Sequence, residues 1–202
     1  MRPWPQGSPS SALWFFRKLS NGPVLVGSRI MVRPPNMDDF KQWSELRLES
    51  RKFLEPWEPT WNEDEFTRGS FRRRLSIYRD WAARDHGYAF FIFETTHNQL
   101  VGAISLSHVR RGAEQSATLG YWIGLKFAMQ GYMTEALKLI VNHSFETLGL
   151  HRVEAACLSR NAASKKLLES SGFKEEGYAL GYIKIAGRWE DHLLFARLKT
   201  LN

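Results

Sequence analysis

The sequence predicts an α/β protein of the α+β type, in which a mixed, mostly antiparallel sheet of six to seven strands carries helices on both faces. Three observations support this fold class. Residues 88–124 form strand-like segments that are separated by short turns. Two segments with apolar residues three and four apart, 131–148 and 161–171, flank a β-branched strand at 151–158. The chain has 202 residues, 43% of them hydrophobic, which is enough for one complete core.

The first third of the chain is expected to contain an extension, one strand and two helices. Residues 1–23 are rich in Pro, Ser and Gly without a regular period, so they are interpreted as a flexible extension before a single domain over residues 24–202. The expected elements are a strand over 25–34, a helix with Asp38 as its N-cap, a loop over 54–59 and a second helix over 64–84.

The rest of the chain is expected to supply most of the sheet and two further helices. The expected elements are strands over 88–94, 100–106 and 116–124, a helix over 131–148, a strand over 151–158, a helix that begins at Asn161, and strands over 173–184 and 189–197. Ala186 and Gly187 form the turn between the last two strands.

The segment from Gly120 to Leu137 is expected to form a strand, a tight loop and the start of a helix in direct succession. At such a junction the first helical turn leaves several backbone N–H groups unpaired, and the helix dipole adds positive potential. Gly131 lets a ligand approach the backbone because it has no Cβ atom. The segment is therefore either a phosphate-binding loop or a packed connection.

The charge of the chain favours anionic partners. Its net charge is +7, which suits nucleic acid, a ribosome or a phosphate-bearing cofactor. Much of the excess lies in residues 68–79, where helical spacing places Phe71, Leu75 and Tyr78 on one face and arginines on the others. This arginine-rich helix is either a solvated surface or a contact for ribosomal RNA.

The remaining composition points to a cytoplasmic protein. The single cysteine, Cys157, has small apolar neighbours, which predicts a buried side chain and a reducing compartment. The sequence has no apolar run near the roughly 18 residues of a membrane span, so no membrane association is expected.

Several motifs together resemble those of the GNAT acetyltransferase superfamily, and in particular its RimJ/RimL type of ribosomal-protein N-acetyltransferase, over about residues 24–198. The segments that carry the resemblance are Phe53–Trp57, Gly120–Gly124, Gln130–Leu137, His151–Glu154, Asn161–Ser164, Leu168–Gly177 and Gly187–His192. The resemblance implies the GNAT fold, acetyl-CoA as the acetyl donor, and no metal.

The resemblance also implies where acetyl-CoA binds. Its pyrophosphate would lie on backbone N–H groups of the loop, and its pantetheine arm between the fourth and fifth predicted strands, which would splay apart and free a backbone N–H for the thioester oxygen. The amide of Asn161 can line this cleft and cap its own helix. The implied cofactor-binding residues are Ile123, Met129, Gln130, Gly131, Tyr132, Met133, Thr134, Asn161 and Ser164.

The chain departs from the family pattern at three positions. Ala128 stands where a Gln or Arg side chain usually braces the phosphate loop, and Met129 replaces a frequent glycine. Backbone contacts survive such changes, so we expect weaker binding of acetyl-CoA rather than none. A tyrosine that acts as general acid in many members is replaced by Leu168.

Candidate catalytic residues follow from the chemistry of acetyl transfer. An α-amine has a pKa of about 8, so part of it is neutral at pH 7 and a base contributes modestly. Ser164, which the resemblance places near the CoA sulfur, is the candidate acid, and a small helix residue beside the cleft is the alternative. Glu58, acting through water, is the candidate base, with Glu55 and Glu154 as competitors. Trp57 either walls the acceptor pocket or belongs to the core.

The acceptor is expected to be a primary amine. The resemblance suggests the N-terminal α-amine of a protein, such as the N-terminal alanine of a ribosomal protein, and an association with the ribosome. A small-molecule amine, antibiotic or toxin is the alternative acceptor. A third hypothesis is a non-catalytic GNAT-like module that binds RNA through residues 68–79. Ala128 favours this hypothesis because the side chain that usually braces the phosphate loop is absent there. A monomer or a homodimer is expected.

Overall fold

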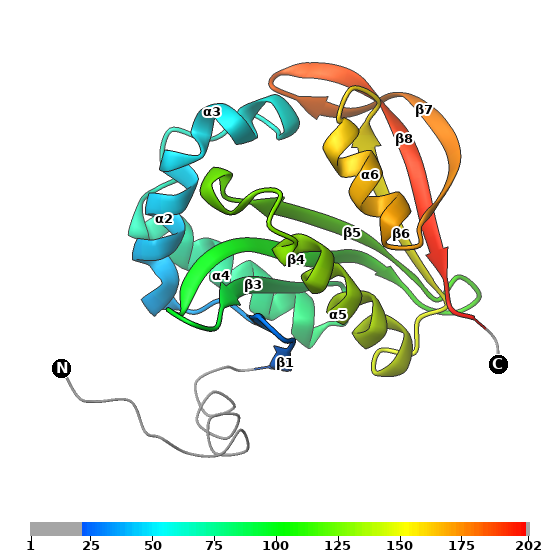
Figure 1. Ribbon diagram of the computed structural model, residues 1–202, viewed down its shortest axis with the longest axis horizontal. Helices are drawn as coiled ribbons and strands as arrows, with labels where there is room; N and C mark the ends of the chain where they lie inside the picture. Colours follow the sequence, from blue (N-terminus) through cyan, green and yellow to red (C-terminus); the bar gives the residue numbers. More distant parts are fainter. Residues whose placement is uncertain (1–21, 201–202) are drawn as a thin grey trace.

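The computed structural model describes residues 22–200 and contains one sheet of eight strands in the order β1-β2-β3-β4-β5-β6-β8-β7 (Figure 1). All neighbouring strands are antiparallel except β5 and β6, which are parallel. The predicted mixed, mostly antiparallel sheet is confirmed. The predicted extension, residues 1–23, lies almost entirely outside the described residues.

The predicted number of six to seven strands is wrong because the strand expected over 25–34 is two strands. β1 (Leu25–Val26) and β2 (Ile30–Arg33) pair as a short hairpin, closed by the hydrogen bond from the Gly27 N–H to the Ile30 carbonyl at 2.8 Å. The chain turns at Gly27, where a Cβ atom would collide with the Glu135 carboxylate. The close approach of this carboxylate therefore requires a glycine at the turn.

Helices fill the segment between β2 and β3. In order they are η1 (Met37–Asp39), α2 (Phe40–Glu49), α3 (Arg51–Leu54), η2 (Glu55–Trp57) and α4 (Arg68–Ala83). The predicted N-cap is wrong: Asn36 caps this segment by accepting a hydrogen bond from the Asp38 N–H, because a 3₁₀ turn precedes the α-helix. The predicted helix start at residue 64 is also wrong, since Thr67 is the N-cap of α4.

The C-terminal two thirds follow the predicted order closely. The elements are β3 (Tyr88–Glu94), β4 (Gln99–Arg110), β5 (Ser116–Ile123), η3 (Leu125–Phe127), α5 (Tyr132–Glu146), β6 (Arg152–Leu158), α6 (Ala162–Ser170), β7 (Lys174–Ile185) and β8 (Arg188–Leu198). Ala186 and Gly187, both with positive φ, form the two-residue turn of the last hairpin, as predicted.

The two faces of the sheet are covered by different helices. Phe90 meets His143 of α5 at a ring distance of 6.2 Å, whereas its neighbour Phe91 meets Phe71 of α4 at 6.3 Å. Successive strand residues point to opposite faces, so α5 covers one face and α4 the other. Phe71 and Leu75 of α4 are buried, as the helical spacing predicts. Within residues 22–200, no helix combines the length and apolar character of a membrane span.

Candidate active site

The parallel pair of β5 and β6 separates half-way along its length. Ser116–Leu119 pair with Arg152–Ala155, but beyond Leu119 the strand β5 pairs only with β4, as far as Ile123. β6 meanwhile continues to Leu158 against β8. The predicted splay between these two strands is confirmed. It leaves the main chain of Gly120–Ile123 without a partner strand on its β6 side among the described residues.

The loop after β5 presents a row of free backbone donors. The N–H groups from Met129 to Thr134 donate to no acceptor in the described part of the chain. The loop reaches this shape through positive φ angles of 60° at Met129 and 84° at Gly131, immediately before α5. Consecutive N–H groups at the start of a long helix form an anion-binding surface. A pyrophosphate therefore fits this loop.

The loop is braced by groups that the sequence analysis missed. Arg29, at the β1–β2 turn, donates from Nη1 to the Gln130 carbonyl at 3.1 Å, and the Gln130 amide donates to the Lys126 carbonyl at 2.7 Å. Glu135 in turn accepts from the Ser28 hydroxyl and the Arg29 N–H, each at 3.0 Å. These contacts hold the loop in place of the side chain that Ala128 lacks. Arg29 is about a hundred positions earlier in the chain, so the local sequence gives no signal of it.

Glu135 is ionised over a wider pH range than an ordinary glutamate. Burial raises its pKa, but the hydrogen bonds from the Arg29 and Ser28 groups and the Arg29 charge outweigh burial and hold the pKa below its usual value. The carboxylate that anchors the β1–β2 turn to α5 therefore keeps its charge at neutral pH.

Helix α6 carries the other predicted residues to the splay. The Asn161 Oδ1 atom accepts the Ser164 N–H at 3.0 Å, which confirms Asn161 as an N-cap. The Asn161 Nδ2 group donates to no residue within 22–200, so its donors remain available to a ligand. The Ser164 hydroxyl lies 2.7 Å from the hydroxyl of Tyr121, a residue of β5 that the sequence analysis did not single out. A tyrosine is thus present beside Ser164 although Leu168 occupies the family's usual position.

A cavity of about 280 Å³ lies on the α2/α4 face of the sheet, directly behind the splay. Its floor is a row of small residues in register across three strands: Ala89 of β3, Ser105 of β4 and Gly120 of β5. Because larger side chains are absent from this row, the helices above it leave a hollow. The Trp122 side chain lines its β5 side, whereas Tyr121 contributes only its main chain because its side chain points to the other face.

Glu58 is the predicted catalytic carboxylate that lines this cavity. Its two oxygens accept from the Arg47 guanidinium at 2.7 and 2.6 Å, and Oε2 also accepts from the Trp61 indole at 2.7 Å. The Arg47 side chain is only 7% exposed, and its guanidinium carbon lies 4.2 Å from the Trp61 ring centre and 4.9 Å from that of Trp122. Glu58 is therefore held rigidly.

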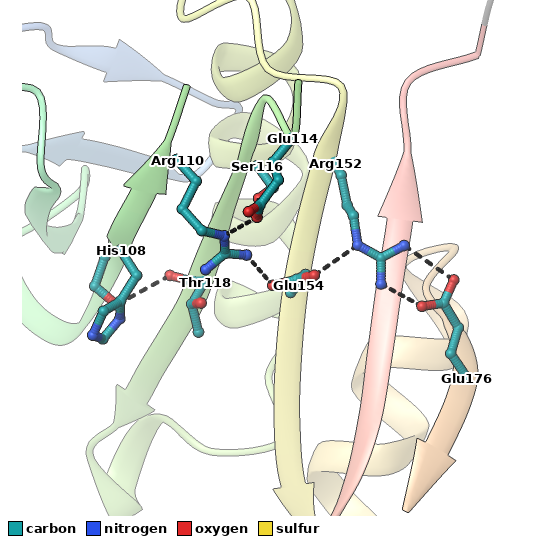
Figure 2. A network of polar contacts seen from close by, with 9 residues as sticks. His108, Arg110, Glu114, Ser116, Thr118, Arg152, Glu154 and Glu176 are labelled. Atoms are coloured by element: carbon teal, nitrogen blue, oxygen red, sulfur yellow. Dashed lines mark hydrogen bonds and ion pairs between the residues drawn. The ribbon is translucent and has the colours of Figure 1, made fainter. Parts of the chain in front are cut away.

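The other predicted residues of this wall lie elsewhere. Glu55 is exposed and pairs with Arg51 at 2.6 Å. Glu154 belongs to a surface ladder of charges, in which Arg110 and Arg152 bind it from both sides (Figure 2). Trp57 does not line the cavity and faces Arg160 instead, with 6.0 Å from the guanidinium carbon to the ring centre.

The β7–β8 hairpin is tied to the loop that carries Glu58. The hairpin tip reaches across to the end of α3 (Figure 1), and the Ala186 N–H donates to the Glu58 carbonyl at 3.0 Å. Arg160, which precedes α6, forms a second tie through Glu190 of β8 at 2.9 Å. The hairpin thereby connects the loop that carries Glu58 to the elements that carry Asn161 and Ser164.

Comparison with known proteins agrees with this geometry. Residues 29–174 match the family model described as an acetyltransferase (GNAT) domain. The chain belongs to the GNAT acetyltransferase family. It is therefore an N-acetyltransferase of this family, and the fold that the sequence resemblance implied is confirmed.

The similarities place the chain among the RimJ-like GNAT proteins. It is 38% identical over 175 residues to Probable N-acetyltransferase YjcK of Bacillus subtilis (strain 168), which covers 87% of this chain and 97% of that protein. It is 33% identical over 172 residues to the [Ribosomal protein uS5]-alanine N-acetyltransferase of Escherichia coli (strain K12), covering 85% and 89%. The structure of Mycobacterium smegmatis RimJ in complex with CoA-disulfide is 34% identical, with a TM-score of 0.80 and coverage of 88% and 86%.

Proposed function

We propose that this GNAT protein transfers the acetyl group of acetyl-CoA to the N-terminal α-amine of a protein, with a ribosomal protein as the acceptor. The observation that carries the proposal is the junction of β5 and α5. There, free N–H donors from Met129 to Thr134 lie next to a splayed sheet that has a separate cavity on its opposite face.

On the donor side, the chain offers a binding surface that matches CoA in its chemistry. The backbone donors of residues 129–134 suit the pyrophosphate, including those of Gln130, Tyr132 and Met133. The main chain at Ile123, which has no partner strand on its β6 side, suits the amides of pantetheine. Asn161 and Ser164 face the same opening from α6. When bound, acetyl-CoA supplies the activated acyl group.

On the acceptor side, the size and closure of the cavity favour the end of a chain. Its 280 Å³ is near the lower limit of about 300 Å³ for pockets that enclose drug-sized molecules. The floor of Ala89, Ser105 and Gly120 accepts a small first residue, and the Ala186 N–H holds the hairpin tip beside the loop that carries Glu58. The uS5-alanine acetyltransferase named above acts, by its name, on an alanine of a ribosomal protein. An N-terminal alanine is small enough for the floor of this cavity.

Within this site we assign Glu58 as the base and Ser164, in the place of a general acid, as the hydrogen-bond donor that stabilises the departing thiolate. A carboxylate has about four acceptor positions, and Arg47 and Trp61 occupy three of those on Glu58. The remaining position can hold a water that takes the proton of the attacking amine. Ser164, across the splay, can donate to the departing sulfur.

Ion pairs between α4 arginines and acidic residues just before the helix disfavour the hypothesis of a pure RNA-binding module. Arg73 pairs with Asp64, and Arg74 pairs with Glu65, so two arginines of the basic segment are neutralised. A contact with ribosomal RNA would depend on the remaining charges of this helix.

Two measurements test the proposal. Calorimetric titration should show binding of acetyl-CoA, and replacing Gly131 by valine should abolish it, because φ there is 84°. Mass spectrometry should then detect acetylation of peptides that copy ribosomal N-termini, with the same peptides blocked at the N-terminus as the control. If acetyl-CoA does not bind at millimolar concentration, the proposal that this protein uses acetyl-CoA to acetylate an amine fails. If only small amines are acetylated, the ribosomal assignment fails.

A further inference from the structure

The partly buried side chain of Tyr121 makes its polar contact with Ser164. Tyr121 lies on β5 opposite Ile104, on the face of the sheet that carries α6, and its hydroxyl is 2.7 Å from Ser164 Oγ. Ser164 also hydrogen-bonds the Cys157 thiol, and this contact lowers the pKa of the thiol against the larger effect of burial, which raises it. The neighbours of Ser164 are thus a phenol and a thiol.

The direction of the Ser164 proton decides what Ser164 can do. A serine hydroxyl has a single proton and rotates to suit its surroundings. If the Ser164 hydroxyl donates its proton to Tyr121, it cannot also donate a hydrogen bond to a sulfur atom between β5 and β6. The Asn161 contact fixes the Ser164 main chain at 3.0 Å but leaves this rotation free.

We propose that Tyr121 is a positioning residue, whose hydroxyl donates to Ser164 Oγ and so directs the Ser164 proton toward the sulfur of the thioester. This inference rests on the proposed function and adds a residue to it. Tyr121 keeps its own proton to donate, because burial raises the pKa of its phenol above the ordinary value.

The proton balance of the reaction agrees with a positioning role. The C–N bond forms as the C–S bond breaks, and the amine nitrogen passes one proton through a water to the Glu58 carboxylate, which then releases it to solvent. The sulfur leaves as a thiolate that is stabilised by the Ser164 hydrogen bond and takes one proton from solvent. Neither Ser164 nor Tyr121 has to end as an anion in a buried site, where an uncompensated charge is costly.

The test compares Tyr121→Phe, Ser164→Ala and the double variant with the unaltered protein. Each single variant should lose about tenfold in kcat with little change in KM for acetyl-CoA, as expected for one lost hydrogen bond to developing charge. The double variant should lose no more than Ser164→Ala, because Tyr121 acts through Ser164. Tyr88→Phe is the matched control, since it removes a phenol that bonds Asp85 at 2.6 Å, outside the site.

A second measurement reads the contact with sulfur directly. Affinity for CoA should rise about tenfold between about pH 7 and about pH 9 relative to desulfo-CoA, because a directed donor favours the thiolate. Tyr121→Phe should remove this rise and leave desulfo-CoA binding unchanged. An unchanged pH dependence in Tyr121→Phe, or a loss confined to KM, would overturn the role of Tyr121. If neither CoA nor desulfo-CoA binds the unaltered protein, the proposed function itself fails and takes this role with it.

Discussion

At the scale of single residues, the loop before α5 contains one residue in an unfavourable backbone conformation. Met129 adopts a φ of 60° although it is not a glycine, and its side chain is 90% exposed. A left-handed conformation costs a residue with a Cβ atom about 1 kcal/mol, and this exposed side chain recovers little of that by packing. The loop therefore holds its shape against a local preference, through contacts made elsewhere.

Met129→Gly should consequently stabilise the protein. We expect the free energy of unfolding to rise by roughly 0.5–1 kcal/mol in urea denaturation, since glycine adopts positive φ without a steric penalty. Ala163→Gly is the control, because it places a glycine at an exposed position inside α6, where a loss of about 1 kcal/mol is expected. A loss at both positions would show that the Met129 conformation carries no strain.

At the scale of elements, the β1–β2 hairpin has a role that its length does not suggest. Its two strands contain six residues together, yet its turn supplies the Arg29 contact to the Gln130 carbonyl and the Ser28 contact to Glu135. A hairpin at the edge of the sheet thus fixes the start of α5. The orientation of the phosphate loop depends on this contact between distant segments.

Replacing Arg29 by methionine should weaken acetyl-CoA binding about tenfold. The change removes a charge-assisted hydrogen bond to the loop, typically about 1.5 kcal/mol, while the Arg29 main-chain N–H still serves Glu135. Calorimetric titration measures the effect. Arg79→Met on α4 removes the same charge far from the loop, so equal losses in the two variants would point to net charge rather than to the brace.

At the scale of the whole molecule, a ladder of charges joins three strands of the sheet. Arg110 of β4, Glu154 and Arg152 of β6, and Glu176 of β7 alternate in sign across it (Figure 2). Burial raises the pKa of Glu154, but hydrogen bonds from Arg152 and Arg110 outweigh it, and the pKa lies below the usual value. The ladder is therefore charged at neutral pH.

Glu154→Gln should reduce the free energy of unfolding at pH 7 by about 1 kcal/mol. The difference between the variant and the unaltered protein should become smaller as the pH is lowered. The folded-state pKa is lower than the unfolded one, so the stabilisation is present above the unfolded value of about 4.3 and is lost as pH falls through the folded value. The magnitude is small because the four side chains are about a third exposed and screened by solvent. Urea denaturation between about pH 7 and pH 3 measures it.

Glu45→Gln provides the control for this prediction. Glu45 forms an exposed pair with Lys41 at 3.9 Å, so its replacement should change stability by less than about 0.5 kcal/mol at any pH. A Glu154→Gln effect that stayed constant with pH would contradict the role of its charge.

Local patterns in the sequence predict most of the fold, because strands 88–124 and the helices at 131–148 and 161–171 are long and regular. The division of residues 25–34 into two strands was not predictable, since the turn depends on the approach of Glu135 to Gly27. The same limit applies to the site. The loop at 129–134 and the splay follow from local order, whereas Arg29 and Tyr121 are recognised only when distant segments meet.

The separation of β5 and β6 has a consequence for how the two substrates bind. The proposed acetyl-CoA site lies on the α5/α6 side of the sheet and the 280 Å³ cavity on the α2/α4 side, and the sheet between them is interrupted where β5 and β6 separate. Two reactants that arrive from opposite sides do not compete for space and can be present together. Such a site has no need to store the acyl group on a side chain, and each product can depart by the side from which its precursor came.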